Sequence, residues 1–178
     1  MTNIQLQTDR LILRPPALAD IDRWTDMMSD PVTTQYIGGV QPRAMVWRAL
    51  AAMVGAWHLT GVSMFSVIRK SDGLWLGRIG PWCPDGWPGQ EVGWSLHQDA
   101  QSQGYAKEAA IACMDYAVNT LQWQDIIHTI EPGNLASKKL AQRLGSSFIG
   151  PGKLPAPHQT AQVEIWGQSA EQWRSQRS

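Results

Sequence analysis

Cysteine, net charge and long apolar runs are all scarce in this chain of 178 residues. Its two cysteines, Cys83 and Cys113, are too few for a disulfide scaffold. Fifteen basic and fifteen acidic side chains give a formal net charge of zero, which leaves no electrostatic footprint for nucleic acid or an anionic membrane. The apolar runs are far shorter than the roughly 20 residues of a membrane span, and the N-terminus has no signal-peptide pattern. We therefore expect a cytoplasmic protein with no nucleic-acid or membrane partner.

Motifs of several enzyme classes are missing as well. None of the four histidines stands at metal-ligand spacing from another histidine or a cysteine, so we predict no metal site. No Gly-x-Ser-x-Gly supports a hydrolase, and neither Gly-x-x-x-x-Gly-Lys nor Gly-x-Gly-x-x-Gly supports a nucleotide-binding domain. Phe and Tyr are rare, with two and three residues, whereas Trp occurs ten times. The chain thus concentrates its aromatic content in the ring that carries an N–H donor.

Periodicity and turn-forming residues predict a single α+β domain over residues 1–178. The predicted strands are 9–14, 64–69, 74–79, 91–96, 125–130, 148–149 and 160–166. The predicted helices are 17–28, 43–59, 106–121 and 134–144, with a helical turn at 169–174. Asp30-Pro31 should end the first helix, and the Pro- and Gly-rich stretch 81–89 should have no regular structure. We expect a mostly antiparallel sheet of six to seven strands flanked by about four helices, with one parallel pair around helix 106–121.

The turn between strand 91–96 and helix 106–121 is the segment most suited to binding a ligand. A strand that runs straight into a helix presents unpaired backbone N–H groups at the positive end of the helix dipole, where phosphate binds. Gly104 lets the ligand approach the backbone, and Ala106 keeps the start of the helix uncrowded. Taken alone, the pattern also fits an ordinary turn.

The motifs around this turn resemble those of the GNAT family of acetyl-CoA-dependent N-acetyltransferases. They are Gln101-x-x-Gly104-x-Ala106, then Asn134-x-x-Ser137, then Leu144-Gly145. Three further stretches look like the RimJ/RimL-like branch, which acetylates protein N-termini, notably ribosomal ones: 8–14, 91–96 and 104–109. The resemblance covers roughly residues 8–150 and implies a GNAT fold whose sheet splays open at the acetyl-CoA site.

The resemblance also implies which residues bind acetyl-CoA, the expected cosubstrate. The pyrophosphate would lie on the turn, the pantetheine arm along the end of the preceding strand, and two polar side chains would contact the coenzyme from the far side. In that order, the residues are Gln101, Ser102, Gln103, Gly104, Tyr105 and Ala106; Leu96 and His97; and Asn134 and Ser137. Asn134 as a plain helix cap and His97 as an ordinary loop histidine are the alternatives.

Glu91 matches the strand glutamate that several family members use as a general base. Partial burial would raise the pKa of its carboxyl toward neutrality, whereas the alternative is a surface glutamate at a strand end. Many family members also have a tyrosine that protonates the departing thiolate, but this chain has Ala141 at that position. Ser137 and Tyr105 are the substitutes considered.

We therefore expect an enzyme that transfers acetyl from acetyl-CoA to a primary amine, either a protein N-terminus or a small molecule. A non-catalytic module that binds acyl-CoA is the alternative, and a homodimer is left open. Four aspartates could bind an acceptor: Asp22, Asp26, Asp30 and Asp85. Trp82 and Trp87, in the loop before Glu91, either form a wall for the acceptor or anchor the loop.

Overall fold

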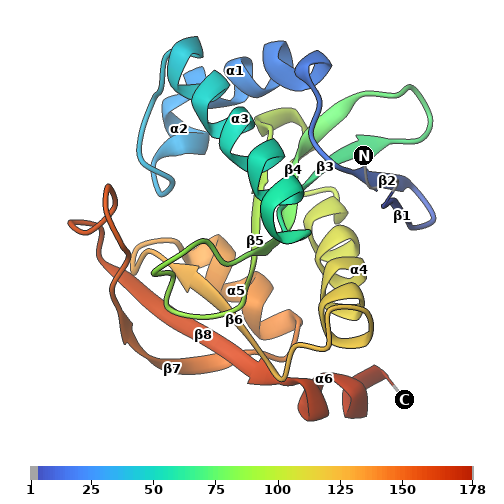
Figure 1. The fold of residues 1–178 in the computed structure, drawn as a ribbon, viewed down its shortest axis with the longest axis vertical. Helices are drawn as coiled ribbons and strands as arrows, with labels where there is room; N and C mark the ends of the chain where they lie inside the picture. The colour runs from blue at the N-terminus through green and yellow to red at the C-terminus, as the bar shows by residue number, and fades with distance from the viewer. Residues whose placement is uncertain (1–3, 178) are drawn as a thin grey trace.

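A computed structural model describes residues 4–177, which form one eight-stranded sheet with helices on both faces (Figure 1). The strand order is β1-β2-β3-β4-β5-β6-β8-β7. The strands are β1 (Leu6–Gln7), β2 (Leu11–Arg14), β3 (Phe65–Arg69), β4 (Trp75–Trp82), β5 (Glu91–Leu96), β6 (Asp125–Ile130), β7 (Ser147–Gly152) and β8 (Val163–Ser169). The helices are α1 (Ile21–Ser29), α2 (Pro31–Thr34), α3 (Arg43–Thr60), α4 (Tyr105–Asn119), α5 (Leu135–Arg143) and α6 (Ala170–Arg177).

The α+β class and the single parallel pair are confirmed, whereas the element counts were too low. The short strand β1 pairs with β2 and was not predicted. Asp30 does end α1, but its carboxylate accepts the N–H groups of Val32 and Thr33 and so starts the short helix α2, with Pro31 in the first turn. The helix α6 is also longer than the predicted turn.

Strand β4 continues through Pro81 to Trp82, which contradicts the prediction of irregular structure from residue 81. Pro81 pairs with Val92 of β5, while the pairing of β4 with β3 ends at Ile79 opposite Phe65. Beyond Ile79, β4 therefore has a neighbour on one side only. The missing N–H of Pro81 costs no ladder hydrogen bond when it faces the unpaired side.

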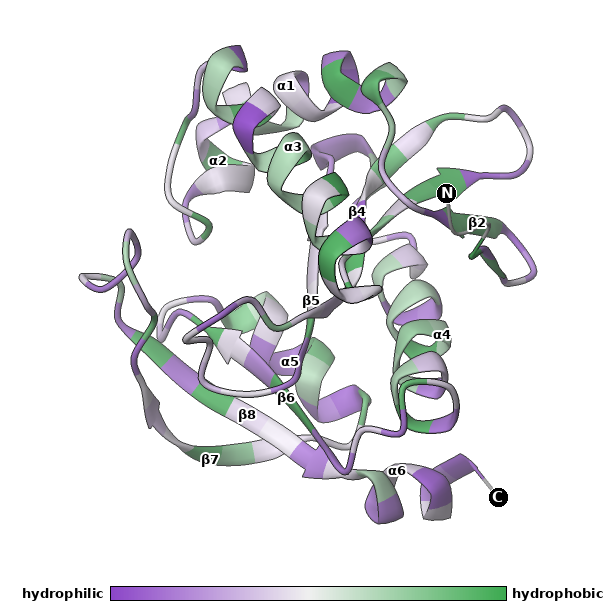
Figure 2. Ribbon diagram, in the orientation of Figure 1, coloured by the Kyte–Doolittle hydropathy of each residue, from purple (hydrophilic) through white to green (hydrophobic). Residues whose placement is uncertain are grey.

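The two faces of the sheet have separate apolar cores. Helix α4 covers one face and packs on residues such as Val67, Ile79 and Val92. Helices α1 and α3 cover the other face, with Trp24 and Met64 among the buried residues. Figure 2 shows the difference in helix composition: α3 is mainly white to green, whereas the terminal helix α6 is largely purple. Among residues 4–177, no helix is long and apolar enough to cross a bilayer.

The sheet splays open between its two parallel strands. Strands β5 and β6 share only the pair Glu91–Ile127, and the rest of β5 has no backbone partner on that side. The side chain of His128 enters this gap, where its Nδ1 lies 2.7 Å from the carbonyl oxygen of Val92. The opening places Glu91 at the point where the two strands diverge. The splay that the resemblance implies is thus present.

Candidate active site

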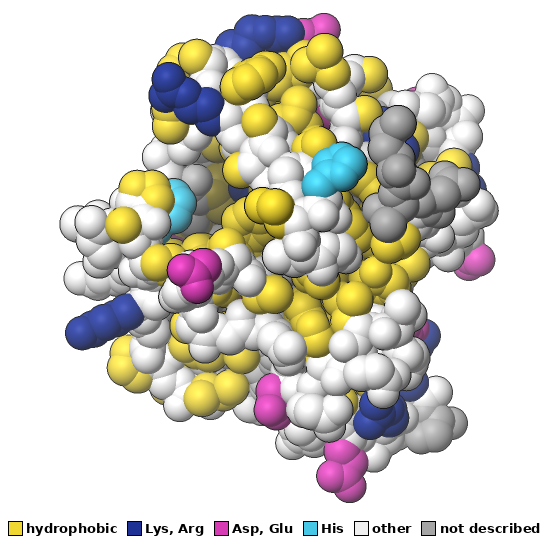
Figure 3. All heavy atoms as spheres, viewed as in Figure 1, with side chains coloured by type: hydrophobic (Ala, Val, Ile, Leu, Met, Phe, Trp, Pro, Cys, Tyr) yellow, Lys and Arg dark blue, Asp and Glu magenta, His cyan; other side chains and the backbone are white. Residues whose placement is uncertain are grey.

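Side chains of β5 alternate between the two faces of the sheet, as the sequence predicts. Val92 and Leu96 belong to the core beneath α4. A Cβ atom on Gly93 would lie 2.6 Å from Cε of Met64 and 3.3 Å from Oε1 of Glu91, so Glu91 shares the face of α1 and α3. Figure 3 shows this side of the molecule hollowed between α1–α3 at the top and the β7–β8 loop at the left.

The Glu91 carboxyl group is buried, with 5% of the residue exposed, and both oxygens accept hydrogen bonds. Oε1 accepts from the backbone N–H of Thr129 at 3.1 Å, and Oε2 accepts from Nε1 of Trp87 at 2.5 Å. The Thr129 hydroxyl lies 3.0 Å from either oxygen. Burial raises the pKa of Glu91 to about 7, although these donors favour the ionised form. A carboxyl group with that pKa can accept a proton near neutral pH.

The loop before Glu91 contributes to the site through a hydrogen bond that neither interpretation of its tryptophans included. Trp87 donates its ring N–H to Glu91, and its ring meets that of Trp82 edge to face at 6.3 Å. Trp82 packs against the core beneath α1 and α3. The pair therefore anchors the loop and also stabilises the ionised carboxylate.

Arg78 of β4 lies on the same face as Glu91 and Met64. Its Nη1 is 3.4 Å from Sδ of Met64, and its guanidinium lies over the ring of Trp24 at 5.4 Å. Its Nε is buried and has no hydrogen-bond partner among the described residues. Desolvation lowers the pKa of Arg78 to about 10, while the charge of Glu91 opposes this shift.

On the opposite side of β5, the turn before α4 has the backbone shape expected of a phosphate-binding turn. Ser102 has φ of 60° and Gly104 has φ of 82°, and Gly104 is the N-cap of α4 without a side-chain capping bond. The first N–H groups of α4 are therefore not occupied by a capping side chain. This geometry fits the pyrophosphate of a coenzyme.

The two glutamines of the turn brace it rather than point outward. Nε2 of Gln101 donates to the carbonyl oxygen of Leu96 at 3.0 Å, and Nε2 of Gln103 donates to the carbonyl oxygen of Asp99 at 2.6 Å. Arg10 donates from Nη1 to the carbonyl oxygen of Gln103 at 3.1 Å. These bonds use carbonyl groups and so occupy no N–H group of the turn, although the N–H of Gln101 itself donates to the Gln98 carbonyl oxygen at 3.4 Å.

The His97 side chain lies between two carboxylates and is almost fully buried. Its Nδ1 is 2.7 Å from Asp99 and its Nε2 is 2.7 Å from Asp26 of α1. Arg23 completes this charged group by pairing with Asp99. The ring thus ties the strand end to α1, which favours the loop-histidine interpretation. The backbone of His97 is engaged as well, because its N–H donates to the Leu76 carbonyl oxygen at 2.8 Å and its carbonyl oxygen accepts from the N–H of Ala100 at 2.9 Å.

Asn134 and Ser137 lie at the start of α5, across the splay from β5. The Asn134 side chain accepts the N–H of Ser137 at 3.1 Å, so it does cap the helix. The hydroxyl oxygen of Ser137 accepts from Nε1 of Trp94 at 3.1 Å, which links α5 to β5. Because that oxygen acts as an acceptor, the hydroxyl proton of Ser137 is free to be donated.

His128 holds the splay open as a neutral side chain. Its burial lowers its pKa to about 4. Nδ1 faces a carbonyl oxygen, that of Val92, and must carry the proton, so Nε2 accepts from the Ser146 hydroxyl at 2.9 Å. Trp94 packs on the imidazole, with ring centres 4.7 Å apart.

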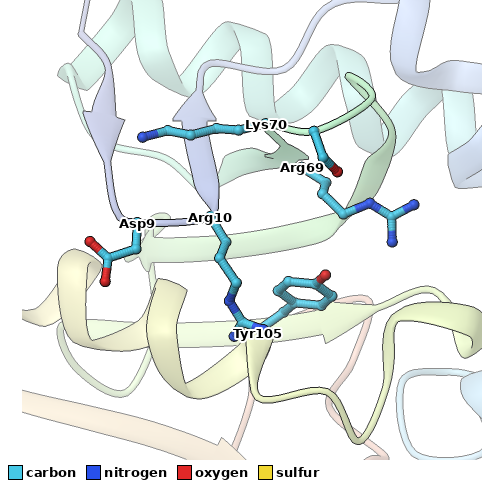
Figure 4. Close-up of a pocket in the computed structure, with 6 residues that line it drawn as sticks. Asp9, Arg10, Arg69, Lys70 and Tyr105 are labelled. Carbon is cyan, nitrogen blue, oxygen red and sulfur yellow. The ribbon is translucent and has the colours of Figure 1, made fainter.

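Tyr105 does not face the splay. A cavity of about 370 Å³ lies beside it, lined by Asp9, Arg10, Arg69, Lys70, Ser71 and Tyr105. In Figure 4 the Arg10 side chain runs to the Tyr105 ring, while the ends of Arg69 and Lys70 point in opposite directions. All three basic groups already have partners, namely Glu108, Asp72 and the Thr8 carbonyl oxygen. Ala141, at the usual tyrosine position, is fully buried in α5.

Sequence reasoning missed Arg78, Thr129 and His128 as parts of the site. Thr129 and His128 carry no local signal, because their importance depends on how β6 diverges from β5. Arg78 does carry one: it is the single charged residue in the otherwise apolar strand β4. A lone charge within a buried strand indicates either an ion pair or a binding site.

Comparisons with known proteins agree with the fold. A model of the acetyltransferase (GNAT) domain matches residues 10–147. Protein p20 of Bacillus licheniformis, named an uncharacterized N-acetyltransferase, is 32% identical over 143 residues, 78% of this chain and 80% of p20. The acetyltransferase from Agrobacterium tumefaciens strain C58 superposes with a TM-score of 0.83 at 27% identity, covering 94% of this chain and 95% of that one. RimL, a ribosomal L7/L12 alpha-N-protein acetyltransferase in complex with coenzyme A, shares the fold with a TM-score of 0.76 at 13% identity. The superposition covers 93% of this chain and 98% of RimL.

Proposed function

The chain belongs to the GNAT family of acetyltransferases and is an acetyl-CoA-dependent acyltransferase, and on that premise we propose that it acetylates a primary amine with Glu91 as general base. The observation that carries this proposal is the Glu91 carboxyl group, buried where β5 and β6 part, with a pKa of about 7. A base with that pKa is about half ionised at neutral pH, and its ionised form accepts a proton readily.

The reaction is a direct transfer in a ternary complex. The neutral amine nitrogen attacks the thioester carbonyl, the C–N bond forms, the C–S bond breaks, and coenzyme A leaves as the thiolate. The Glu91 carboxylate takes the proton that the amine loses. Ser137 is the better placed of the two substitute acids for the thiolate, because Tyr105 faces the cavity with Arg10.

The coenzyme-binding residues of the proposal follow the turn and the splay. Backbone N–H groups of residues 102–106, next to Gln101, would hold the pyrophosphate. The unpaired side of β5 up to Leu96, which precedes His97, would pair with the pantetheine arm as an added strand does. Asn134 and Ser137 border the far side. The αL turn and the missing strand partner support this assignment.

A protein N-terminus is the proposed acceptor in the RimJ/RimL-like branch, with small amines as the alternative. The fold shared with RimL supports this branch. We also propose that residues 1–178 form one acetyltransferase domain, because a single core joins Leu11 near its start to Trp173 near its end. Cytoplasmic localisation and a homodimer stay predictions.

Thiol release from acetyl-CoA, measured with a panel of amines, tests the proposal. The panel holds peptides with free N-termini and small primary amines, and the matched control is each peptide with a blocked N-terminus. We expect release only with the free amines, together with a product heavier by one acetyl group. Tight coenzyme binding without stimulated release across the panel would instead support the acyl-CoA-binding module.

A thermal-shift titration separates coenzyme binding from turnover. Acetyl-CoA at 100 times its Kd should add about 2.7 kcal/mol to the free energy of unfolding. ATP at the same concentration is the control and should add much less, because the chain has no nucleotide-binding motif.

A further inference from the structure

Among residues 4–177, Arg78 is a cation without a counter-ion, on the face of the sheet that α1 and α3 cover. A guanidinium has five N–H donors, yet this one makes a single contact of hydrogen-bond length, to the sulfur of Met64. Its Nε is buried without a partner, and no carboxylate among residues 4–177 lies within ion-pair distance of it. Leaving a charge unpaired where it is largely removed from water is costly, so such a group is normally paired.

The acidic side chains on the elements around Arg78 are already engaged. Asp20 pairs with Arg14 and accepts from the Ser66 hydroxyl, and Asp26 contacts His97. Glu91 accepts from Trp87 and Thr129 and reaches Arg78 only through its longer-range charge. The part of the chain that the structure describes therefore pairs no carboxylate with this guanidinium.

We propose that Arg78 binds a carboxylate of the acceptor, so that the preferred acceptor is an amine that also carries an acidic group. This inference rests on the proposed function of Glu91. Arg78 is half-buried. It lies on the same face of the sheet as Glu91, and Met64 and the backbone of Gly93 lie between the two side chains. A ligand in that space would contact both groups.

The register of the sheet sets the spacing of the two acceptor groups. Arg78 lies opposite Ser95, and Ser95 is four residues along β5 from Glu91. At 3.3 Å per residue, the two backbones are about 13 Å apart along the strand. Both side chains are long and shorten that span, but the amine and the carboxylate still have to be several bonds apart. The planar guanidinium of Arg78 suits a carboxylate bound through two hydrogen bonds.

The unpaired positive charge of Arg78 also disfavours a polycationic acceptor. Of the four aspartates considered for binding an amine, three are engaged in the structure: Asp22 with Arg43, Asp26 with His97, and Asp30 as the cap of α2. Asp85 is exposed in the loop before β5. The charge that faces the acceptor beside Glu91 is positive.

Matched pairs of amines test this inference. The small-molecule pairs are 5-aminopentanoate and 6-aminohexanoate, each against its carboxamide. The peptide pair is Ser-Glu amide against Ser-Gln amide, so the two arms distinguish a small molecule from a protein N-terminus. For at least one pair, we expect the wild-type kcat/KM for the acid to exceed that for its neutral partner by roughly tenfold or more.

Three variants test whether Arg78 causes the preference for the acid over its neutral partner. Arg78→Met removes the charge at similar volume and should bring the ratio of acid to neutral amine close to one, while Arg78→Lys should retain part of the preference. Arg48→Met is the matched control, because Arg48 also contacts a methionine sulfur at 3.4 Å but lies exposed on α3. It should behave as the wild type. No preference in any pair, or a preference that survives Arg78→Met in a protein with unchanged Tm, overturns the inference.

A binding measurement keeps the inference separate from the catalytic proposal. In the presence of coenzyme A, calorimetry with 5-acetamidopentanoate and 6-acetamidohexanoate, which need no turnover, compares wild type with Arg78→Met. A Kd for at least one of the two that rises about tenfold in the variant supports the carboxylate site even if no amine is acetylated. Equal Kd values overturn it even if Glu91 proves to be the base.

Discussion

The proposed site has two halves, one on each side of β5. One half is built mainly from backbone groups and the other mainly from side chains. On the α4 side, the turn of residues 101–106 offers backbone N–H groups, and its side chains only brace it. On the α1 and α3 side, the acting groups are the side chains of Glu91, Trp87 and Arg78, together with the hydroxyl and the backbone N–H of Thr129. They come from β4, β5, β6 and the loop before β5. The first half depends on local backbone shape, and the second on how distant segments meet.

This difference predicts different responses to mutation. A backbone site tolerates most side-chain changes except where the backbone needs glycine. A side-chain site in a buried environment depends on individual protons and charges, because each donor or acceptor there is costly to leave unpaired. The four tests below separate the halves on that basis.

Glu91→Gln should have the largest effect, a fall in kcat of about 100-fold or more. In the wild type, kcat/KM should rise with pH through about 7 as the Glu91 carboxyl loses its proton, and the variant should lack that rise. The Kd for acetyl-CoA should stay the same, because the turn lies on the other side of β5. A wild-type pH–rate profile in the variant would remove Glu91 from the mechanism.

Glu164→Gln is the control for this substitution. Glu164 of β8 likewise accepts a hydrogen bond from a tryptophan ring, that of Trp166, at 2.9 Å, but its pKa is lowered by this bond and by Lys138. Its variant should retain the wild-type kcat and pH profile.

Glu91 and His128 should have opposite effects on stability between pH 4.5 and 6.5. The pKa of Glu91 is raised by folding to about 7, so its contribution to the free energy of unfolding falls as pH rises from 4.5 toward 7. The pKa of His128 is lowered to about 4, so its contribution falls as pH drops from 6.5 toward 4. Each full shift corresponds to about 3 kcal/mol, and in the wild type the two slopes cancel.

Urea denaturation of two variants between pH 4.5 and 6.5 separates the two pH dependences of stability that cancel in the wild type. The stability of His128→Asn should fall with rising pH relative to wild type, because Asn can still donate to the Val92 carbonyl oxygen but does not titrate. The stability of Glu91→Gln should rise with pH relative to wild type. Parallel curves for all three proteins would show that neither group is shifted by burial.

Gly104→Ala tests the backbone half and should raise the Kd for acetyl-CoA by about tenfold. A side chain at φ of 82° is strained by about 1–2 kcal/mol, so the turn would relax and its N–H groups would lose their alignment. Gly39→Ala is the matched control, since Gly39 has φ of 74° and open space around it. Both variants should lose similar stability, and a coenzyme affinity lost equally in both would refute the special role of the turn.

The features that the sequence predicts and those that it misses divide in the same way, between local backbone shape and contacts of distant segments. The turn and its glycine lie in six consecutive residues, and the alternation of β5 follows from its period of two, so both were predicted. The donors to Glu91 come from Trp87, four residues before it, and Thr129, 38 residues after it, and only the splay of β6 brings Thr129 there. The Asn134 cap was also predictable, because it bonds to a residue three positions away.

Strand lengths were predicted less well for a physical reason that Pro81 shows. Pro81 predicts the end of β4, yet the strand continues to Trp82, because β3 has already ended and the missing N–H has no partner there to lose. That condition concerns the position of another strand, which no local pattern contains. Arg78 was missed in the same way: the sequence shows a charge within β4, but only the packed structure shows that no carboxylate of residues 4–177 pairs with it.

Trp87→Phe should have the smallest effect and ties the loop to the side-chain half. Removing the ring N–H takes away a donor at 2.5 Å from the Glu91 carboxylate, so the pKa of Glu91 should rise further above its ordinary value. The midpoint of the kcat–pH profile should then move up by about one unit, equivalent to a hydrogen bond of ~1–2 kcal/mol. Trp82→Phe is the control: its ring contacts Trp87 but donates no hydrogen bond to Glu91, so its midpoint should not move. A Trp87→Phe enzyme with an unmoved midpoint and only a lower Tm would make Trp87 a loop anchor, whereas a raised acceptor KM at constant midpoint would make it a wall of the acceptor site.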